Sequence, residues 1–524
     1  MRNVVKLLCC TLAMFVLTSL PLAYGQAATS GMTGEVTDSS GAVIPGAEVT
    51  LSNATTGLKF TQTTNGTGEY RFANIPPGQG YEATFSASGF TPVDVKSIYL
   101  TVATVRTQNA TLSVGAHTEI EVTASNSEVT INTSDATVGN TFDVQQLNNL
   151  PVEQRNDPTA LFTLQPGVTD SGAVTGARVD QNNVTLDGLD VNDFATGGAS
   201  QQQYVGTGVV QGFGSGTIVG HAPVDSVEEF HGTVGGNLSD TGPSSGGQFQ
   251  LVTKSGTNHF HGNLNEYHRD PSLVANTWFG NNSTPIVPRN HLIQNQFGGA
   301  VGGPILIPKL LNGRDRLFFF FDFNENRVIS AAIQQRTVPL DSLRNGNIGY
   351  CTNASKDCST TNYLTAAQVQ ALDPAHAGEN QAWLSGINKR FPHSNNNVTG
   401  DGINTGGFAF NAPNNDDETN YVGRIDYNLN ENMKIFGRFT IARENAVETP
   451  NQFDGDPPTS PFIDRTYAAV VGHTWVIGNN KTNRVFLGET VQKYSFPNEF
   501  NPDGSTPAPA PYWTALPYFL TPAP

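Results

Sequence analysis

The second half of this chain carries a period-two alternation of apolar and polar residues, the pattern that most narrows what the chain can fold into. In 421–429, Ile425 and Tyr427 fall on one face of an extended strand. Arg424 and Asp426 fall on the opposite face. Strands of about ten residues with one apolar and one polar face form the walls of membrane β-barrels. The alternation therefore predicts a wall with lipid on one side and a lumen on the other.

Seven strands of this kind are expected beyond residue 254, and the connections between them alternate in length. Membrane barrels place short turns on the periplasmic rim and long loops on the outer rim, an order that a soluble sandwich has no reason to follow. The stretch 330–420 is therefore expected outside the cell, with a short helix at 366–372. The expected strands are 259–268, 295–304, 315–329, 421–429, 433–441, 466–477 and 483–495. The long connections are 269–294, 330–420 and 445–466, and the short ones are 305–314, 430–431 and 478–482.

The N-terminus has the features of an export signal. The basic residues Arg2 and Lys6 precede an apolar run at 7–20, which is too short to span a bilayer. A motif of two small residues separated by one position ends at Gly25. We therefore expect a signal peptide over 1–25, with an uncleaved membrane anchor as the alternative.

Two cysteines, Cys351 and Cys358, follow the expected signal peptide. An exported chain meets oxidising conditions, so a local disulfide between them is expected. A metal site would need further ligands close to the two cysteines, and the sequence around them offers none. No run of about 20 apolar residues follows the signal, which leaves strands as the means of crossing a membrane.

Residues 28–113 are expected to form a small β-sandwich, because short strands alternate with turn residues along this stretch. Its motifs are Gly34-x-Val36-x-Asp38-x-x-Gly41-x-x-x-Pro45-Gly46-Ala47-x-Val49 and Gly68-x-Tyr70-x-Phe72. With these motifs the stretch resembles the carboxypeptidase regulatory-like domain, a prealbumin-like sandwich. The resemblance implies a module that binds carbohydrate or a partner protein, or a spacer without a ligand. It implies no peptidase activity.

Residues 126–254 are rich in Gly, Asn, Thr and Val and carry few helix signals. The segment 183–190 predicts a strand, a turn at Asp187 and Gly188, and a second strand. The order of the motifs in this region and the residues within them resemble the plug domain of TonB-dependent outer-membrane transporters. The resemblance is to the Oar-like branch, which carries an N-terminal sandwich. The resemblance is strongest at 225–276, and it implies a plug domain over 126–254.

Residues 114–125 form a polar link between the sandwich and the expected plug. An extended segment within such a link can add as a strand to the sheet edge of a partner, and an ordinary linker strand is the alternative. The resemblance implies coupling to an inner-membrane protein of the TonB type, although the usual basic stretch after the segment is missing. The segment expected to couple energy is formed by Glu121, Val122, Thr123 and Ala124.

Residues 255–524 are expected to form the N-terminal part of an incomplete barrel. A plug of this size needs a barrel of about 22 strands around it, and single-chain bacterial barrels have an even number of strands. Seven strands are expected here, and the chain ends in a Pro-rich stretch that includes 507–511. We therefore expect a truncated sequence whose sheet cannot close as written.

The sequence as a whole predicts a mainly β outer-membrane receptor that takes up an unknown small ligand or carbohydrate through a plugged barrel. The N-terminal domain is expected in the periplasm. A surface-exposed carbohydrate-binding protein or adhesin without transport is the alternative. No catalytic residue, metal site or cofactor is expected, because His259 and His261 lack completing ligands and no nucleophile motif occurs. The net charge of −17 argues against a nucleic-acid partner.

Overall fold

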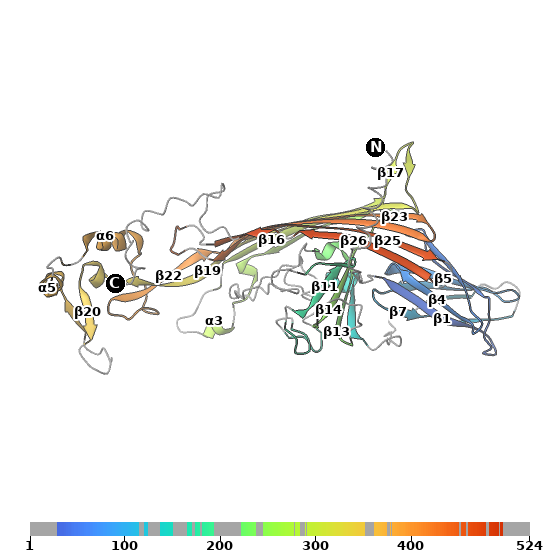
Figure 1. Ribbon diagram of the computed structural model, residues 1–524, viewed down its shortest axis with the longest axis horizontal. Coiled ribbons are helices and arrows are strands. Elements are labelled where there is room, and N and C mark those ends of the chain that lie inside the picture. Colours follow the sequence, from blue (N-terminus) through green and yellow to red (C-terminus); the bar gives the residue numbers. More distant parts are fainter. Residues whose placement is uncertain are drawn as a thin grey trace, which may run out of the picture.

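The described residues are mainly β-strand and form three modules, which are a sandwich, a five-stranded sheet and a long curved wall (Figure 1). The expected fold class is confirmed, and the wall does not close on itself within these residues. None of the helices in the same ranges is long and apolar enough to cross a membrane. The computed structural model describes residues 29–114, 120–123, 137–149, 165–169, 173–178, 181–192, 222–236, 245–276, 278–282, 289, 291–351, 361–374, 378, 380–449, 452–456, 460–477, 481–491 and 493–495.

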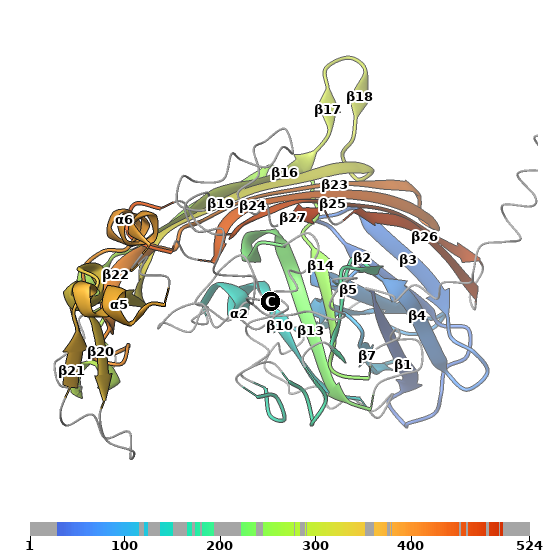
Figure 2. The same ribbon diagram turned by 60° about the vertical axis from the view of Figure 1, so that its left-hand side comes forward.

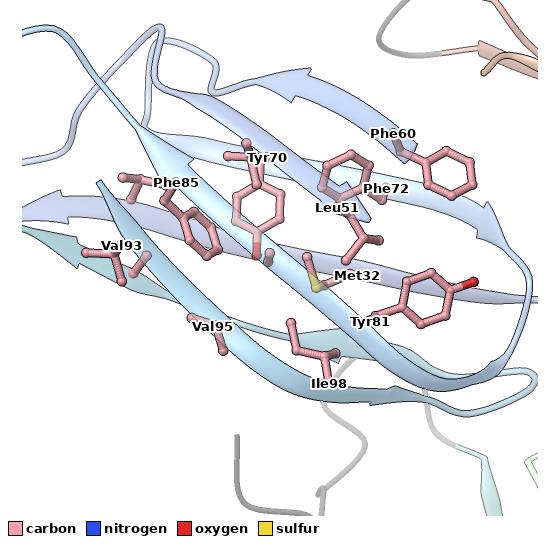
Figure 3. Close-up of a cluster of buried hydrophobic side chains, with 14 of the residues drawn as sticks. Met32, Leu51, Phe60, Tyr70, Phe72, Tyr81, Phe85, Val93, Val95 and Ile98 are labelled. Carbon is pink, nitrogen blue, oxygen red and sulfur yellow. The ribbon is translucent and has the colours of Figure 1, made fainter. Parts of the chain in front are cut away.

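The sandwich has two sheets whose inward side chains form one apolar core. Short strands with alternating burial face each other across this core, as period-two patterning requires. Figure 3 shows its large members, which include Met32, Leu51, Tyr70, Phe85 and Ile98. One sheet contains β4 (Glu69–Ile75), β1 (Ser30–Asp38), β7 (Val105–Thr107) and β8 (Ala110–Leu112). The other runs in the order β3 (Leu58–Thr63), β2 (Glu48–Asn53), β5 (Gly78–Ser86), β6 (Val93–Leu100) and β9 (Ile120–Thr123).

The five-stranded sheet follows the sandwich in the chain and has its own small core. Phe230 stacks between Phe142 and Phe249, with ring centroids 5.5 Å and 5.9 Å away. Two short helices, α2 (Val144–Asn149) and η3 (Val224–Ser226), adjoin the sheet. The strand order is β10 (Val138–Asp143), β13 (Val227–Gly235), β14 (Gln248–Thr253), β11 (Asn183–Leu186) and β12 (Leu189–Asp190).

The wall is an antiparallel sheet that arches over the other two modules (Figure 2). All seven expected strands are present, but most are longer than expected. Their backbone pairing continues beyond the stretch in which apolar and polar residues alternate. One further strand, β22 (Thr405–Pro413), pairs with β19 and was not expected. The strand expected at 483–495 is divided, and its last part forms β27 (Tyr494–Ser495), which pairs with β25. The order is β15 (His261–Arg269), β16 (Leu292–Pro304), β19 (Leu317–Pro339), β23 (Asp416–Asn430), β24 (Met433–Thr449), β25 (Ser460–Ile477) and β26 (Lys481–Val491).

Burial in the wall is inverted relative to a water-soluble protein. Its concave side buries polar side chains, and its convex side exposes large apolar ones, as a wall between lipid and lumen requires. Buried polar residues include Gln294, Gln296, Asn324, Asn326, Glu418, Asn420, Arg438, Thr440, Glu444, Asp464 and Thr466. Exposed apolar residues include Leu264, Phe321, Ile329, Ile425, Phe439, Tyr467, Val471, Trp475, Val485 and Leu487.

The connections sit at opposite ends of the wall. The sandwich and the hairpin β17 (Leu306–Ile307) with β18 (Leu311–Asn312) lie at one end, and the long connection between β19 and β23 lies at the other (Figure 1). The helix expected at 366–372 is present as α5, and a capping box between Thr365 and Gln368 begins it. The long connection contains α4 (Asp341–Arg344), β20 (Ile348–Cys351), β21 (Thr361–Leu364), α5 (Ala366–Leu372) and α6 (Gln381–Arg390). The connection between β15 and β16 contains η4 (Pro271–Leu273) and α3 (Trp278–Asn282).

Candidate functional site

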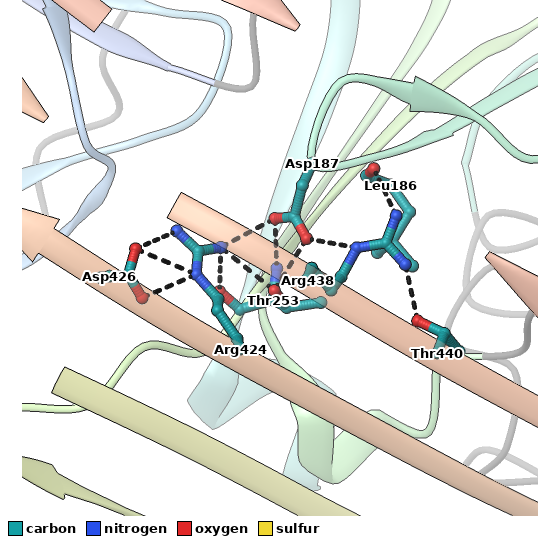
Figure 4. Close-up of polar contacts among 7 residues, drawn as sticks. All are labelled: Leu186, Asp187, Thr253, Arg424, Asp426, Arg438 and Thr440. Atoms are coloured by element: carbon teal, nitrogen blue, oxygen red, sulfur yellow. Dashed lines mark hydrogen bonds and ion pairs between the residues drawn. The ribbon is translucent and has the colours of Figure 1, made fainter. Parts of the chain in front are cut away.

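The candidate site begins at the tight turn between β11 and β12. Leu186 pairs with Leu189, so Asp187 and Gly188 form a two-residue hairpin loop. Both have positive φ, 51° and 82°, which Asp and Gly tolerate best and which two-residue hairpins favour. The turn expected from the sequence is therefore present. It carries the Asp187 side chain beyond the sheet and toward the wall (Figure 4).

The carboxylate of Asp187 joins the five-stranded sheet to two strands of the wall. Its Oδ1 lies 2.9 Å from Nη1 of Arg424, and its Oδ2 lies 2.9 Å from Nε of Arg438. The side chain of Asp187 is 2% exposed and that of Arg438 is 0% exposed. Figure 4 shows the carboxylate between the two guanidinium groups. A charge-paired bridge buried this deeply is costly to break, because each partner would be left as an uncompensated charge.

Several hydrogen bonds surround the bridge. The backbone N–H of Thr253 donates to Oδ1 of Asp187 at 3.0 Å, and its hydroxyl donates to Oδ2 at 2.8 Å. Arg438 donates to the Leu186 carbonyl at 3.2 Å and to the Thr440 hydroxyl at 2.6 Å. Arg424 forms a second ion pair, at 2.8 Å, with Asp426 on its own strand. The bridge is thus a connected network, which we call the latch: Leu186, Asp187, Thr253, Arg424, Asp426, Arg438 and Thr440.

A second polar attachment joins the five-stranded sheet to β15. Asn263 and Asn265 donate to the two carboxylate oxygens of Asp225, at 2.9 Å and 2.7 Å. The Lys254 ammonium donates to the Asp225 carbonyl at 2.8 Å. The sheet is therefore held by hydrogen bonds at two separate places on the concave side of the wall.

The sandwich contacts both of the other modules. Its Val102 backbone N–H donates to Oε1 of Glu229 on β13 at 2.8 Å. Its Thr55 carbonyl accepts from the Asn258 backbone N–H, also at 2.8 Å. Further contacts to the wall are Arg484 with Thr29 at 3.2 Å and with Asn74 at 3.3 Å, Asn428 with the Thr56 carbonyl at 3.5 Å, and Lys434 with the Phe60 ring centroid at 3.8 Å.

A cavity of about 490 Å³ lies where the three modules meet. The sandwich contributes Tyr81 to its lining, the five-stranded sheet contributes Glu228, and the wall contributes Arg424, Lys434 and Phe436. Its lining carries both signs of charge together with aromatic rings. A displacement of any one module would change the shape of this cavity, because no single module encloses it.

Two carboxyl groups beside the sandwich are strongly affected by burial. Burial raises the pKa of Glu229 well above its usual value of 4.5, although the hydrogen bond from Val102 acts in the opposite direction. Burial also raises the pKa of Glu228, its neighbour on β13. Burial therefore favours the neutral form of Glu229, and the hydrogen bond from Val102 only partly offsets this effect.

The other sequence-predicted residues lie away from the latch. Glu121, Val122 and Thr123 lie in β9, which pairs with the sandwich strand β6, while Ala124 lies outside the described residues. Cys351 is disulfide-bonded, and Cys358, its expected partner, lies outside the described residues, so that pairing stays a prediction. The expected signal peptide also lies outside them. Within the described ranges, no group of three or more His, Cys, Asp and Glu side chains is arranged to hold a metal ion.

The sequence analysis assigned Arg424 to the polar face of the wall but did not identify Asp187 as the shared partner of Arg424 and Arg438. The register of β23 and β24 places these two arginines directly opposite each other. Like charges at opposed positions destabilise a strand pair unless an anion lies between them. Two facing arginines on neighbouring strands were therefore a signal for a buried carboxylate from elsewhere in the chain.

Comparisons with known proteins agree with this architecture. The family model described as an outer membrane beta barrel domain matches residues 252–519, and the carboxypeptidase regulatory-like domain matches residues 31–113. The TonB-dependent transporter Oar of Myxococcus xanthus is 26% identical over 349 residues, which cover 63% of this chain and 30% of that protein. The chain thus spans about 30% of the length of this curated relative.

The solved structures that match part of this chain include two outer-membrane receptors. A mutant of the ferric enterobactin receptor PfeA from Pseudomonas aeruginosa is 12% identical with a TM-score of 0.37, and the match covers 70% of this chain and 44% of that one. The ferric-catecholate import receptor Fiu from E. coli is 11% identical with a TM-score of 0.33, and the match covers 71% of this chain and 53% of that one.

Proposed function

This chain belongs to the outer membrane β-barrel domain family, and from that premise we propose that it acts in TonB-dependent uptake of a ligand across the outer membrane. The wall spans the bilayer, and the five-stranded sheet is part of the plug on its lumenal side. The sandwich lies in the periplasm, beside the short turns of the wall. The relative of the chain named as a TonB-dependent transporter supports this assignment.

The observation that carries the proposal is the latch. A plug must be held firmly enough to block the lumen and must also be releasable by force from the energy-coupling partner. Asp187 and the two wall arginines supply a compact attachment of this kind at the tip of one hairpin. A pull on the plug sheet loads this attachment directly, because Thr253 of β14 is bonded to the same carboxylate.

The ligand is bound from the outer side, and a small solute or carbohydrate would enter between the outer connections. The segment 121–124 is the proposed contact for the TonB-type protein. The cavity at the junction of the three modules lies on the periplasmic side of the latch, where a ligand would leave the plug.

Deletion of residues 119–124 tests the coupling role in cells that carry the whole gene. Uptake of a labelled ligand should be lost, whereas its binding to the cell surface should be retained. Equal uptake with and without the segment would contradict the proposed coupling. Envelope fractionation and heat-modifiable gel mobility provide a separate check that the chain resides in the outer membrane as a β-wall.

A further inference from the structure

The cavity at the junction of the three modules receives two basic side chains from the wall. Lys434 of β24 is paired with Thr474 of β25, and Thr474 is paired with Arg484 of β26. All three side chains line the cavity. Because the two basic residues lie on strands that are two apart in the sheet, their Cα atoms are separated by about 10 Å. The wall therefore places two long cationic side chains on one side of the cavity.

These two cations are buried without an anionic partner. The Lys434 ammonium nitrogen forms no hydrogen bond with any described residue, and it lies 3.8 Å from the centroid of the Phe60 ring. Nε of Arg484 is likewise buried and unpaired within the described ranges, although its Nη1 donates to Thr29 and Asn74 of the sandwich. A buried cation that lacks an anion is costly, so the placement of the two side chains favours an anionic ligand.

The acidic side chains that line the same cavity have other partners or are neutral. Asp187 and Asp426 are both paired with Arg424. The carboxylate of Asp225 accepts hydrogen bonds from two side chains of β15. Burial raises the pKa of Glu228, which favours the neutral form of this carboxyl group. Among the described residues of the lining, no carboxylate is therefore placed to neutralise the two unpaired cations.

Aromatic rings lie on the same side of the cavity as the cations. Phe436 and Phe486 line it, and their ring centroids are 6.0 Å apart. Both residues are paired with Gly472, and a Cβ atom at that position would lie 2.2 Å from the Phe436 ring. Glycine thus lets the two rings meet over the strand between them. The cavity volume of about 490 Å³ lies within the range of about 300–1,000 Å³ that is usual for sites of small organic ligands.

We propose that this cavity binds a small aromatic carboxylate, with the anionic group between Lys434 and Arg484 and the ring against Phe436 and Phe486. The Thr56 hydroxyl, a buried and unpaired group of the sandwich that also lines the cavity, donates to the same carboxylate. Charge-assisted hydrogen bonds fix the anionic end of the ligand, and the aromatic lining favours a flat apolar body. The inference goes beyond ligand uptake, because this binding requires only the folded chain.

Equilibrium dialysis of the full chain in detergent micelles tests the site, with micelles alone as the blank. The probes are 2-naphthoate, its neutral isostere 2-naphthamide, and acetate, which has the charge without the ring. We expect saturable binding of one 2-naphthoate per chain, at least tenfold tighter than the binding of either other probe. This ranking requires both the cations and the aromatic rings of the lining.

Lys434→Met is the main variant, because Met keeps most of the length of the side chain and removes its charge. It should weaken 2-naphthoate binding at least tenfold. It should not lower the urea midpoint of the unliganded chain, since it removes a buried cation that lacks an anion. The matched control is Lys481→Met on the opposite face of β26, where the side chain is exposed, and this change should leave binding unaltered.

Gly472→Ala tests the aromatic part of the site without a change of charge. The added Cβ atom displaces the ring of Phe436, which lies too close to accommodate it. Binding of 2-naphthoate should become several-fold weaker. Unchanged binding would show that the two rings do not contact the ligand.

The outcomes separate this inference from the proposed function. Equal binding of 2-naphthoate and 2-naphthamide overturns the anion site, and so does the absence of saturable 2-naphthoate binding. A lowered urea midpoint of Lys434→Met together with unaltered binding assigns Lys434 a structural role alone and also overturns it. None of these measurements involves the segment 119–124 or a TonB-type protein, so failure of this site leaves the proposed uptake role standing, and failure of the deletion experiment leaves this site standing.

Discussion

Oε1 of Glu229 accepts a hydrogen bond of 2.8 Å from the backbone N–H of Val102, a residue 127 positions earlier in the chain. Glu229 is fully buried, so this bond joins the sandwich to the five-stranded sheet away from water. Because the acceptor of this bond is the titratable carboxyl group of Glu229, the attachment of the sandwich to the five-stranded sheet should depend on pH.

The sandwich should be held less tightly as the pH rises. Burial raises the pKa of Glu229, so the folded chain binds a proton that the separated form releases above about pH 4.5. Attachment is fully present below that value and weakens as the pH rises through the raised pKa. Glu228, whose pKa burial also raises, acts in the same direction. The protection factor of the Val102 amide should fall from pH 5 to pH 8.

The variant Glu229→Gln should lose most of this pH dependence, because it keeps the side-chain oxygen and removes the proton equilibrium. Glu229→Ala should lower protection at both pH values, since it leaves the Val102 N–H without its acceptor, at a cost of about 1–3 kcal/mol. Glu82→Gln, an exposed change on β5, serves as the control. A protection factor that rises with pH in the unaltered chain would contradict the assigned direction.

Asp187→Asn should weaken the attachment of the five-stranded sheet by about 3–5 kcal/mol, because it leaves the buried Arg438 without its anion and leaves Arg424 with Asp426 alone. Protease cleavage within 222–236 along a urea series measures the release of this sheet. Asp190→Asn is the matched control, since Asn keeps the oxygen that accepts from the Asn192 backbone N–H. Equal urea midpoints for the two variants would show that the latch does not hold the sheet.

Val471→Arg should destabilise the wall by about 2–4 kcal/mol, because Val471 is exposed on the convex, lipid-facing side in the middle of β25. Ile477→Arg makes the same change on the same face at the end of the strand, where the cost falls to about 0–1 kcal/mol. Urea unfolding in lipid vesicles, followed by gel mobility, measures both. A wall that faced water would tolerate the two changes equally.

Arg344→Ala should loosen the long connection between β19 and β23. The Arg344 guanidinium is buried and donates to the Pro339 carbonyl at 3.1 Å, to the Phe391 carbonyl at 2.7 Å and to the Pro392 carbonyl. Its loss leaves these carbonyls without this donor, at about 1–3 kcal/mol for those that water cannot reach. Hydrogen exchange across α4 and α6 should rise, while Arg314→Ala, at an exposed turn, should leave it unchanged. Unchanged exchange in Arg344→Ala would show that other contacts hold this connection.

Much of the architecture could be predicted because it depends on local patterns. Period-two alternation located the wall strands, Asp187 and Gly188 located a two-residue hairpin, and Thr365 with Gln368 explains why the helix at 366–372 begins where it does. Most strands were predicted too short. Beyond the stretch in which apolar and polar residues alternate, the pairing depends on the neighbouring strands rather than on a pattern within the strand itself. β22 was missed for a related reason, since its Gly-rich first half carries no strand pattern of its own.

The latch could be predicted only in part, because its four charged residues are brought together by the register of distant strands. The sequence placed Asp187 on a turn and Arg424 on the polar face of the wall. The position of the Asp187 hairpin along the wall could not be predicted from the sequence. That position depends on contacts between distant segments, such as those of Asp225 with β15. The buried Arg344 was missed as well. Its acceptors are backbone carbonyls, which every residue has, so no residue type in the sequence marks them.

The opposed arginines of β23 and β24 also bear on the order in which the molecule is assembled. If these two strands zip together before the Asp187 hairpin arrives, two cations meet across the pair with nothing between them, and the repulsion favours fraying at that point. The hairpin removes this obstacle when it docks. Pairing of β23 with β24 is thereby favoured by docking of the five-stranded sheet, and under the proposed function this order disfavours the insertion of an empty, leaking pore.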